Sequence, residues 1–368
     1  MKILILNWRC WKHPWAGGAE RYLYEISKRL VKRGHEITWF VSSFDGAKER
    51  EFEDGIEIIR RGGKFSIYLH AFWYYLKELR KRNFDLVIED INGVPFLTPL
   101  YVWKPKKMGI IHHLVGWKIF SKELKLYQAF IAWLAEKLIP IFYFHLPFIT
   151  VSKSSKEELN KNFIKKVSIV QNGLDFKIKA KTQTRKFRKP IIIYLGRFKK
   201  YKRIYLLINA FRIVKKRIKD AELWLVGGGD WKFEGKVEGV KNFGKVDEKR
   251  KKELLTKAWV LVSPSIKEGW GINVIEANAC GTPCIAYDVP GLRDSIVDGK
   301  TGLLVKENGN IEALANAIIK VLEDEKLRNK LSINALKWAR RFSWDKSAKE
   351  FEKIIKMVSK GNIQKPLP

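Results

Sequence analysis

The chain has 368 residues, of which 46% are hydrophobic, which is enough for two domains that each bury a core. It carries 72 Lys and Arg against 39 Asp and Glu, so its formal net charge is +33 at pH 7. Such an excess predicts attraction to anions, namely phosphorylated ligands, acidic lipid headgroups or nucleic acid, and it does not specify a fold. Three cysteines exclude a disulfide framework and favour a reducing cytosol.

In the N-terminal half, apolar runs alternate with amphipathic stretches. We expect strands at residues 2–7, 35–41, 56–60, 85–89, 107–112, 148–151 and 167–170. We expect helices at residues 17–32 and 66–82 and a further helix from Ser154. Strands that are regularly separated by helices predict a parallel sheet.

Two segments bear on secretion and membranes. Residues 1–6 have the pattern of a buried strand and lack the long apolar stretch and cleavage site of a signal peptide. Residues 126–151 are the most apolar region, and their uncharged run, 138–152, is too short to span a bilayer as a helix. We expect either a segment that lies on a surface or two buried helices and a strand.

A basic stretch without apolar periodicity, residues 179–189, predicts an interdomain linker after an N-terminal domain of residues 1–178. The alternation then restarts in a second domain, residues 190–343. We expect strands at 191–195, 222–226, 259–263 and 284–287, and helices at 203–218, 248–258, 272–279, 311–322 and 327–358. The pattern predicts an α/β protein with two doubly wound Rossmann-like domains facing a cleft.

The first candidate site follows the strand that ends at Ser263. A loop with Gly269 and Gly271 leads into a helix, whose N-terminus favours a phosphate because its N–H groups are unpaired. Glu268 precedes this helix and Glu276 lies inside it, and a carboxylate can accept hydrogen bonds from two vicinal hydroxyls. The alternative is that both are ordinary solvated carboxylates, which the apolar, glycine-rich surroundings argue against.

Two more loops follow strands of the second domain. Arg197 and Lys202 can form a clamp for a diphosphate, with Arg as a fork and Lys as a point charge. The alternative is a solvated basic loop, to which we assign Lys199, Lys200 and Arg203. Residues 227–229 are three glycines that permit close approach of a ligand or simply form a tight turn.

In the first domain, Gly17 and Gly18 stand between a strand and a helix, the position of an anion-binding turn. They do not form the G-x-G-x-x-G fingerprint, so a nicotinamide or flavin cofactor is not supported. His112 or His113, at the end of a strand, can hydrogen-bond a sugar hydroxyl or serve as a structural histidine. No His, Cys or Asp cluster has the spacing of metal ligands, so we expect no metal site.

Together these motifs resemble the retaining GT-B glycosyltransferases of family 4, over nearly the whole chain. Four family elements occur in the family's order and spacing: the glycine-rich loop Gly17–Glu20, the N-G-hydrophobic-D turn Asn172–Asp175, the G-R-x4-K element at Gly196, Arg197 and Lys202, and the E-x7-E element at Glu268 and Glu276. The resemblance implies that the C-terminal helix, about residues 344–360, packs back on the first domain.

The resemblance also implies roles for single residues. Arg197 and Lys202 would neutralise the donor diphosphate, Glu276 would hold the ribose, and Glu268 and His112 would act at the transferred sugar. Further donor-binding residues would be Gly17, Gly18, Gly196, Gly227, Gly228, Ser265, Gly269, Trp270, Gly271, Ile272 and Asn273. No cofactor or metal is implied, because side chains and a helix N-terminus would neutralise the leaving group.

The chain departs from the family pattern at three positions. Arg203 stands where the family often has glycine, and Trp270 and Asn273 replace the usual Phe and aliphatic residue.

These observations favour a hexosyltransferase that moves a sugar from a nucleotide-diphosphate sugar to a lipid-linked or saccharide acceptor, in glycolipid, polysaccharide or protein-glycan assembly. The basic charge and the apolar region 126–148 suggest a cytoplasmic protein bound peripherally to an anionic membrane surface. The alternatives are an epimerase or phosphorylase on the same architecture, or a basic nucleic-acid-binding protein. No recognised nucleic-acid-binding module supports the last.

Overall fold

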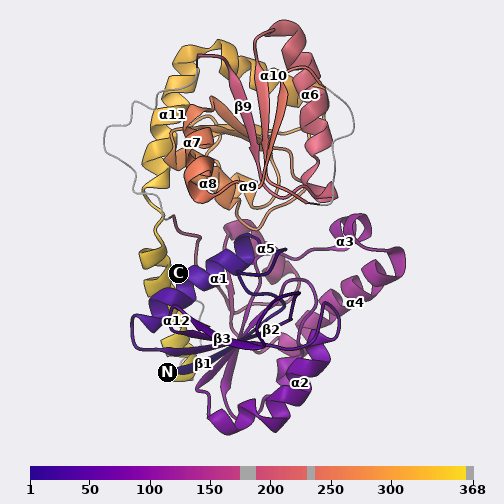
Figure 1. Ribbon diagram of the computed structural model, residues 1–368, viewed down its shortest axis with the longest axis vertical. Coiled ribbons are helices and arrows are strands. Elements are labelled where there is room, and N and C mark those ends of the chain that lie inside the picture. The colour runs from indigo at the N-terminus through magenta and orange to yellow at the C-terminus, as the bar shows by residue number, and fades with distance from the viewer. Residues whose placement is uncertain (175–187, 230–236, 362–368) are drawn as a thin grey trace. The chain divides into compact units, whose positions relative to one another are not determined.

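The computed structural model describes residues 1–174, 188–229 and 237–361. These form two compact units, which Figure 1 draws in one ribbon: Met1–Gly173 with Ser343–Pro368, and Leu174–Phe342. Of the linker expected at 179–189, only Arg188 and Lys189 are among the described residues. Each unit is an α/β layer structure built on its own sheet.

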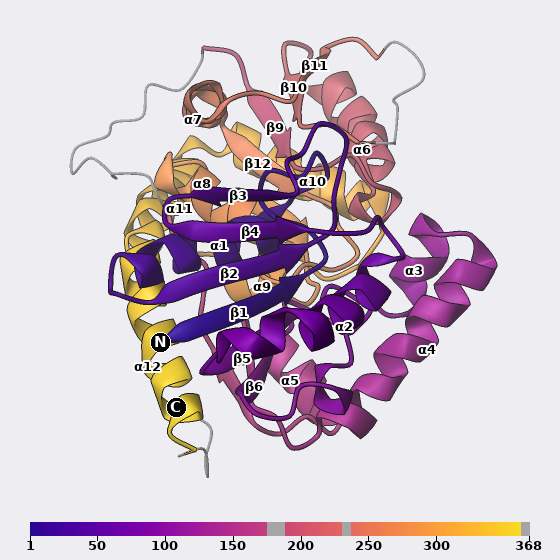
Figure 2. The ribbon, with the colours of Figure 1, turned by 60° about the horizontal axis from the view of Figure 1, so that its bottom comes forward.

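The sheet of the first unit has the strand order β3-β4-β2-β1-β5-β6-β7-β8, and Figure 2 shows β3, β4, β2 and β1 side by side in that order. Neighbouring strands are parallel except β3 and β4. The strands are β1 (Lys2–Asn7), β2 (Glu36–Val41), β3 (Arg50–Glu53), β4 (Ile56–Arg60), β5 (Leu86–Asp90), β6 (Lys106–Ile110), β7 (Phe148–Thr150) and β8 (Val167–Ile169).

Helices cover both faces of this sheet, as the alternation of side chains along a strand requires. On β2, Phe40 packs in one core cluster with Ile67 and Ala71 of α2, whereas Trp39 donates a hydrogen bond from Nε1 to Oγ of Ser27 in α1. The helices of the unit are α1 (Gly18–Val31), α2 (Ile67–Lys77), α3 (Trp117–Glu123), α4 (Leu126–Tyr143), α5 (Lys153–Lys161) and α12 (Trp344–Ser359), with short 3-10 helices η1 (Leu79–Arg82) and η2 (Thr98–Leu100).

The sheet of the second unit is parallel, with the strand order β11-β10-β9-β12-β13-β14. One large apolar cluster, including Ile193, Phe211 and Ile318, fills the space between this sheet and its helices. The strands are β9 (Ile191–Leu195), β10 (Glu222–Val226), β11 (Val240–Gly244), β12 (Val260–Ser263), β13 (Cys284–Tyr287) and β14 (Gly302–Val305). The helices are η3 (Lys200–Lys202), α6 (Ile204–Arg217), α7 (Glu248–Lys257), α8 (Ile272–Ala279), α9 (Leu292–Ser295), α10 (Ile311–Glu323) and α11 (Glu325–Ala339).

The C-terminal helical stretch, expected over 327–358, is two helices in different units. α11 ends at Ala339 in the second unit, and α12 starts after Ser343, whose side chain caps the helix by accepting from the N–H of Lys346. α12 packs against α1, and Oγ of Ser347 donates to the carbonyl of Gln171 at 2.7 Å. A Cβ on Gly173 would lie 2.2 Å from the backbone nitrogen of Trp344, so this close approach requires glycine.

Several expected boundaries were wrong. The helix expected over 66–82 ends at Lys77, and a 3-10 turn follows up to Asn83, which has φ 51°. Ser152, not a residue after it, caps the helix that was expected from Ser154. Strands β3, β11 and β14 were missed because they are short, and the first two are largely polar.

The apolar region 126–148 is one helix followed by a strand. α4 runs from Leu126 to Tyr143 with Pro140 inside it, and β7 begins at Phe148. Within the described ranges, no helix is both long and apolar enough to cross a membrane.

Candidate active site

The two sheets each have a point where the chain order reverses. It lies between β1 and β5 in the first unit and between β9 and β12 in the second. In open α/β sheets, ligands bind beyond the carboxyl ends of the strands at such a point. The predicted site residues follow these strands or their neighbours β6 and β10, so the topology explains why motifs far apart in sequence come together within each unit.

The loops after β9 and β10 approach each other closely, and glycines make this possible. Phe198 donates its backbone N–H to the carbonyl of Gly228 at 2.9 Å. A Cβ on Gly227, which has φ 140°, would lie 1.9 Å from the carbonyl oxygen of Gly196. These predicted glycines therefore have a packing role in the structure, whichever ligand the loops bind.

Lys202 and Glu268 form an ion pair between the loops after β9 and β12, although 66 residues separate them in sequence. Oγ of Ser265 donates to the same carboxylate oxygen, Oε1 of Glu268, at 2.6 Å. Burial alone would lower the pKa of Lys202, but the charge of Glu268 outweighs it and the pKa is raised. Lys202 is therefore a fixed ammonium at neutral pH.

The loop that carries Glu268 ends at the start of α8. Gly271 caps this helix with φ 89°, a left-handed conformation that favours glycine. Gly269 lies two residues before it, and Ile272 follows it as the first residue of α8. The N-terminus of a helix can bind an anion through its first backbone N–H groups. Asn273 and Trp270, which were predicted to bind the sugar donor, use their side chains for contacts within the protein. Nδ2 of Asn273 donates to the carbonyl of Leu195 at 2.8 Å, and the buried ring of Trp270 packs on Phe342.

Glu276 lies one turn further along α8 and is buried, with 5% of its surface exposed. Nζ of Lys251, on α7, lies 2.8 Å from Oε1 of Glu276 and 2.8 Å from Oε1 of Glu248. Lys251 was not predicted from the sequence. One feature of the sequence could have indicated it. Lys251 lies on the same side of α7 as the apolar Leu254 and Leu255, whereas the basic residues around it are exposed.

Arg203 was expected to be solvated, and this was wrong. It is 9% exposed, has φ 52°, and its guanidinium reaches the loops after β12 and β14. The expectation failed because a chain with 72 basic residues gives no sequence signal that singles out a buried one.

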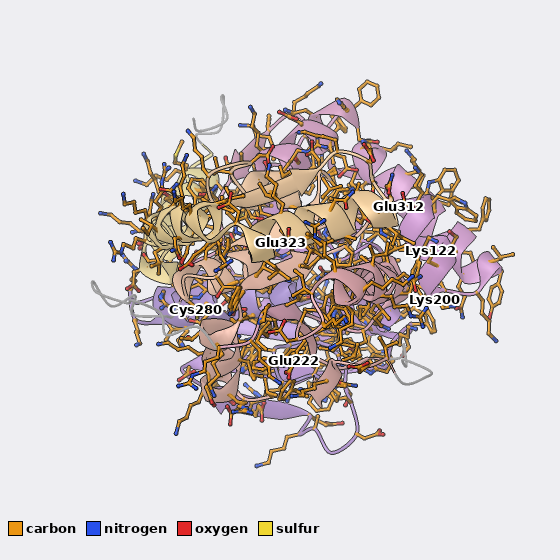
Figure 3. All side chains as sticks on the ribbon, turned by 90° about the horizontal axis from the view of Figure 1, so that it is seen from above. Lys122, Lys200, Glu222, Cys280, Glu312 and Glu323 are labelled. Atoms are coloured by element: carbon orange, nitrogen blue, oxygen red, sulfur yellow. The ribbon has the colours of Figure 1, made fainter. Side chains whose placement is uncertain are left out.

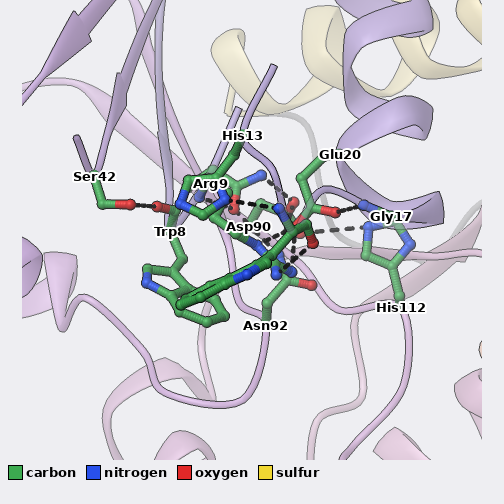
Figure 4. A network of polar contacts seen from close by, with 11 residues as sticks. Trp8, Arg9, His13, Gly17, Glu20, Ser42, Asp90, Asn92 and His112 are labelled. Carbon is green, nitrogen blue, oxygen red and sulfur yellow. Dashed lines mark hydrogen bonds and ion pairs between the residues drawn. The ribbon is translucent and has the colours of Figure 1, made fainter. Parts of the chain in front are cut away.

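In the first unit, Gly17 and Gly18 begin α1, and Figure 4 shows the polar network around them. The N–H of Gly17 donates to Oε2 of Glu20 at 2.7 Å, and Arg9 holds the other oxygen, with Nη2 at 2.6 Å from Oε1. Nη1 of Arg9 also donates to the carbonyl of Trp15 at 2.7 Å. Arg9 and Glu20, which the sequence reasoning missed, thus fix the shape of the glycine turn.

His112 follows β6, which ends at Ile110 rather than at residue 112 as expected. Its Nε2 lies 3.5 Å from Oδ1 of Asp90, and its ring packs edge-on against Tyr22. Asp90 is fully buried, and burial raises its pKa, while His112 opposes this rise. His113 is half-buried and follows in the same loop. The Asp175 end of the Asn172–Asp175 turn lies outside the described residues.

Across 1–174, 188–229 and 237–361, no group of three or more His, Cys, Asp or Glu residues could hold a metal ion. Cys280 and Cys284 are buried thiols at the two ends of the α8–β13 connection.

Comparisons with known proteins show the family of the chain. A family model described as Glycosyltransferase Family 4 matches residues 16–177, and one described as Glycosyl transferases group 1 matches residues 175–338. N-acetyl-alpha-D-glucosaminyl L-malate synthase of Bacillus anthracis is 30% identical over 370 residues, which cover 93% of this chain and 94% of that protein. Phosphatidyl-myo-inositol mannosyltransferase of Mycobacterium leprae is 30% identical over 175 residues, 46% of each chain.

The fold resembles that of the Anabaena protein HepE, solved in complex with UDP-glucose. The TM-score is 0.74 at 16% identity, with 97% of this chain and 99% of that chain covered. The chain therefore belongs to the retaining GT-B glycosyltransferases of family 4, the group 1 glycosyl transferases. It is an enzyme that transfers a sugar from a nucleotide sugar.

Proposed function

We propose that the second unit holds the diphosphate-sugar donor between the loops after β9 and β12. The observation that carries this proposal is the ion pair of Lys202 with Glu268 directly before the N-terminus of α8. A diphosphate in this place would meet the ammonium of Lys202, the guanidinium of Arg197 and the first N–H groups of α8. Glu268 would then exchange part of its contact with Lys202 for hydroxyls of the sugar, and Glu276 would accept from the ribose.

The chemistry that these residues supply is stabilisation of a leaving group. As the bond between the sugar and the diphosphate breaks, negative charge grows on the phosphate oxygens. Cations and N–H groups already aimed at that position stabilise the charge without reorganisation, and this accelerates the reaction. The raised pKa of Lys202 keeps its charge throughout the neutral range. On the family resemblance, we propose that His112 acts at the transferred sugar.

We further propose that the acceptor is lipid-linked and that the enzyme works peripherally on the cytoplasmic face of the cell membrane. Of 18 exposed large apolar side chains among the described residues, 13 lie between Phe65 and Phe144, and only Tyr205 and Ile333 belong to the second unit. Such exposed apolar side chains mark an interaction surface when they gather on a few elements.

The exposed face of α4 shows this best. Tyr127, Phe130, Leu134, Ile141 and Phe144 recur at helical spacing and are each between 45% and 64% exposed. Figure 3, in which Lys122 is labelled, shows ring side chains that project from this part of the chain. Exposed lysines accompany the apolar face at Lys118, Lys122, Lys125 and Lys137. An apolar helix face flanked by lysines fits an anionic bilayer surface.

The inward face of α4 is fixed by polar contacts. Glu136 accepts the backbone N–H groups of Val115 at 2.6 Å and Gly116 at 2.9 Å, and so ties α4 to the start of α3. Tyr143 donates to the buried carboxylate of Glu89 at 2.8 Å. These contacts hold α4 in a fixed orientation, with its apolar face exposed.

The donor proposal is tested by replacing Lys202 with Ala and Glu276 with Gln and measuring sugar release from a panel of UDP-, GDP- and ADP-sugars. Both variants should lose turnover and the thermal stabilisation that the donor gives to the native protein by mass action. Lys199→Ala, in the same loop, is the matched control. Native turnover in Lys202→Ala would contradict the proposal.

The membrane proposal is tested by flotation with phosphatidylglycerol vesicles and phosphatidylcholine vesicles. The native protein should bind the anionic vesicles and dissociate as salt rises, because screening weakens the contribution of the lysines. The double variant Phe130→Ser, Ile131→Ser should not bind, whereas Ile333→Ser in the second unit should bind like the native protein. Equal binding by all three proteins would contradict the proposed surface.

A further inference from the structure

Arg203 is an arginine in a backbone conformation that favours glycine. It directly follows Lys202 and has φ 52° and ψ 40°. A residue with a Cβ is strained in this left-handed region, so something must stabilise arginine here. The family resemblance makes the same point, because the corresponding position often holds glycine.

The side chain of Arg203 contacts the loops that follow β12 and β14. Its Nε donates to the carbonyl of Pro264 at 2.7 Å, and its Nη2 donates to the carbonyl of Ser265 at 2.9 Å and to Oδ1 of Asn308 at 2.6 Å. The guanidinium lies 4.9 Å from the ring centroid of Tyr287, at the end of β13. The side chain of Arg203 thus starts in the loop after β9. It contacts residues in the loops after β12 and β14 and at the end of β13.

These contacts end next to the proposed donor residues. Ser265, whose carbonyl accepts from Arg203, uses its hydroxyl to hold Oε1 of Glu268 at 2.6 Å. Lys202, the neighbour of Arg203 in the chain, is paired with the same oxygen. The two halves of the Lys202–Glu268 pair therefore sit on loops that the guanidinium of Arg203 joins.

The contacts of Arg203 do not neutralise its positive charge. Its three acceptors are two backbone carbonyls and a side-chain amide, which are neutral groups. An arginine remains protonated in proteins, even where burial lowers its pKa, as it does here. The guanidinium of Arg203 is therefore a buried positive charge held by neutral groups, one residue from Lys202 in the chain.

We propose that Arg203 is a positioning residue for the donor diphosphate, which holds Lys202 and the Ser265–Glu268 loop in register. This inference rests on the proposed donor site, and it extends that site to a residue outside the four family elements. Arg203 itself need not touch the substrate.

The test uses the conformation of Arg203. Glycine adopts φ 52° without strain, so Arg203→Gly removes the side chain and leaves the backbone conformation accessible. Arg203→Lys keeps the charge but cannot donate to all three acceptors at once. Arg212→Ala, on the exposed side of α6, is the control. The readouts are KM for the donor, kcat, inhibition by the free nucleoside diphosphate, and the melting temperature.

We expect Arg203→Gly to raise the donor KM and the inhibition constant of the nucleoside diphosphate by about tenfold, which corresponds to about 1.4 kcal/mol, and to lower kcat. Arg203→Lys should fall between Arg203→Gly and the native enzyme, and Arg212→Ala should match the native enzyme. If Arg203→Gly does not fold, a native donor KM in Arg203→Lys overturns the proposal.

A lower melting temperature with native KM, kcat and inhibition constant would show that Arg203 serves folding alone, and would also overturn it. The donor proposal is judged separately by Lys202→Ala. Loss of turnover in Lys202→Ala together with native kinetics in Arg203→Gly defeats only the role of Arg203. Native turnover in Lys202→Ala defeats the donor site itself.

Discussion

Oδ1 of Asp90 lies 3.5 Å from Nε2 of His112, where the chain leaves the adjacent strands β5 and β6. The other oxygen of Asp90 accepts from Nδ2 of Asn7 at 2.7 Å and from Nδ2 of Asn92 at 3.2 Å, so the carboxylate is held on both sides (Figure 4). A carboxylate that faces Nε2 favours the tautomer with the proton on Nε2. Nδ1 of His112 is then an acceptor.

The first prediction concerns this pair. Asp90→Asn keeps the shape of the side chain but removes the charge that fixes the tautomer. We expect kcat to fall by about 10- to 100-fold, by analogy with the loss of a carboxylate that orients a metal-binding histidine. The donor KM should change little, because the diphosphate is proposed to bind to the second unit. Steady-state kinetics test this, with Asn92→Ala as a control that keeps the carboxylate. Native kcat in Asp90→Asn would contradict the orienting role.

The second prediction concerns Lys251 and Glu276, which are 25 residues apart in sequence and 2.8 Å apart in the fold. Lys251→Met removes the cation and leaves the buried carboxylate without it. We expect a loss of about 2 kcal/mol in the free energy of unfolding and a higher donor KM, since Glu276 is proposed to bind the ribose. Chemical denaturation and kinetics measure the two effects.

The control for Lys251→Met is Glu248→Gln. Glu248 is the other partner of Lys251, and its side chain is 61% exposed, so this contact contributes little. The control should change stability by less than about 1 kcal/mol. If Glu248→Gln costs as much as Lys251→Met, the pair with Glu276 is not the important contact.

The third prediction compares two glycines with similar backbones. Gly291 has φ 83° and Gly299 has φ 67°. A Cβ on Gly291 would lie 2.1 Å from the carbonyl oxygen of Glu268, whereas a Cβ on Gly299 would meet nothing within 4 Å. Both Ala variants should lose about 1–2 kcal/mol of stability from backbone strain. Only Gly291→Ala should also lose turnover, because the loop of Glu268 must move. Equal turnover in the two variants would count against this loop as part of the site.

The fourth prediction is a pH dependence. Glu89 is fully buried, and burial raises its pKa, although Thr98, Tyr143 and the N–H of Phe96 donate to it and oppose the rise. A carboxyl whose pKa is raised on folding favours the folded state below its unfolded pKa, and this contribution is lost as the pH rises. Glu89→Gln cannot ionise. Its stability relative to the native protein should therefore improve as the pH rises above about 4, the ordinary pKa of a glutamate.

The measurement is the difference in free energy of unfolding between Glu89→Gln and the native protein across that range. Asp54→Asn, on the exposed side of the unit, serves as the comparison for a surface carboxyl. A difference for Glu89→Gln that stays constant with pH would show that Glu89 does not ionise in the way proposed.

The alternation of apolar strands with amphipathic helices was sufficient to predict the fold. Strands such as Ile191–Leu195 and Glu222–Val226 were predicted with their observed bounds, because a buried parallel strand is a continuous apolar run that helices cannot mimic at this length. Short polar elements such as Arg50–Glu53 were not predicted. Their strand form depends on pairing with a neighbour, which is not encoded in a local pattern.

The loops of the candidate site were also visible in the sequence, since they follow predicted strands and contain glycines and charges. The partners within the site were not. Which cation meets Glu276, and which carbonyls Arg203 reaches, depends on strand order and on helix packing between residues 25 to 105 positions apart. In a chain with 72 basic residues, no sequence pattern separates the few buried cations from the many solvated ones.

The sequence by itself thus determined the two α/β sheets, the loops that carry Lys202 and Glu268 and the helix that carries Glu276, because hydrophobic periodicity and glycine placement are local properties of the chain. Only the tertiary structure decided that Arg203 and Lys251 are buried beside these residues. The physical reason is that burial and charge pairing are set by which segments pack together, and packing is a property of the whole fold.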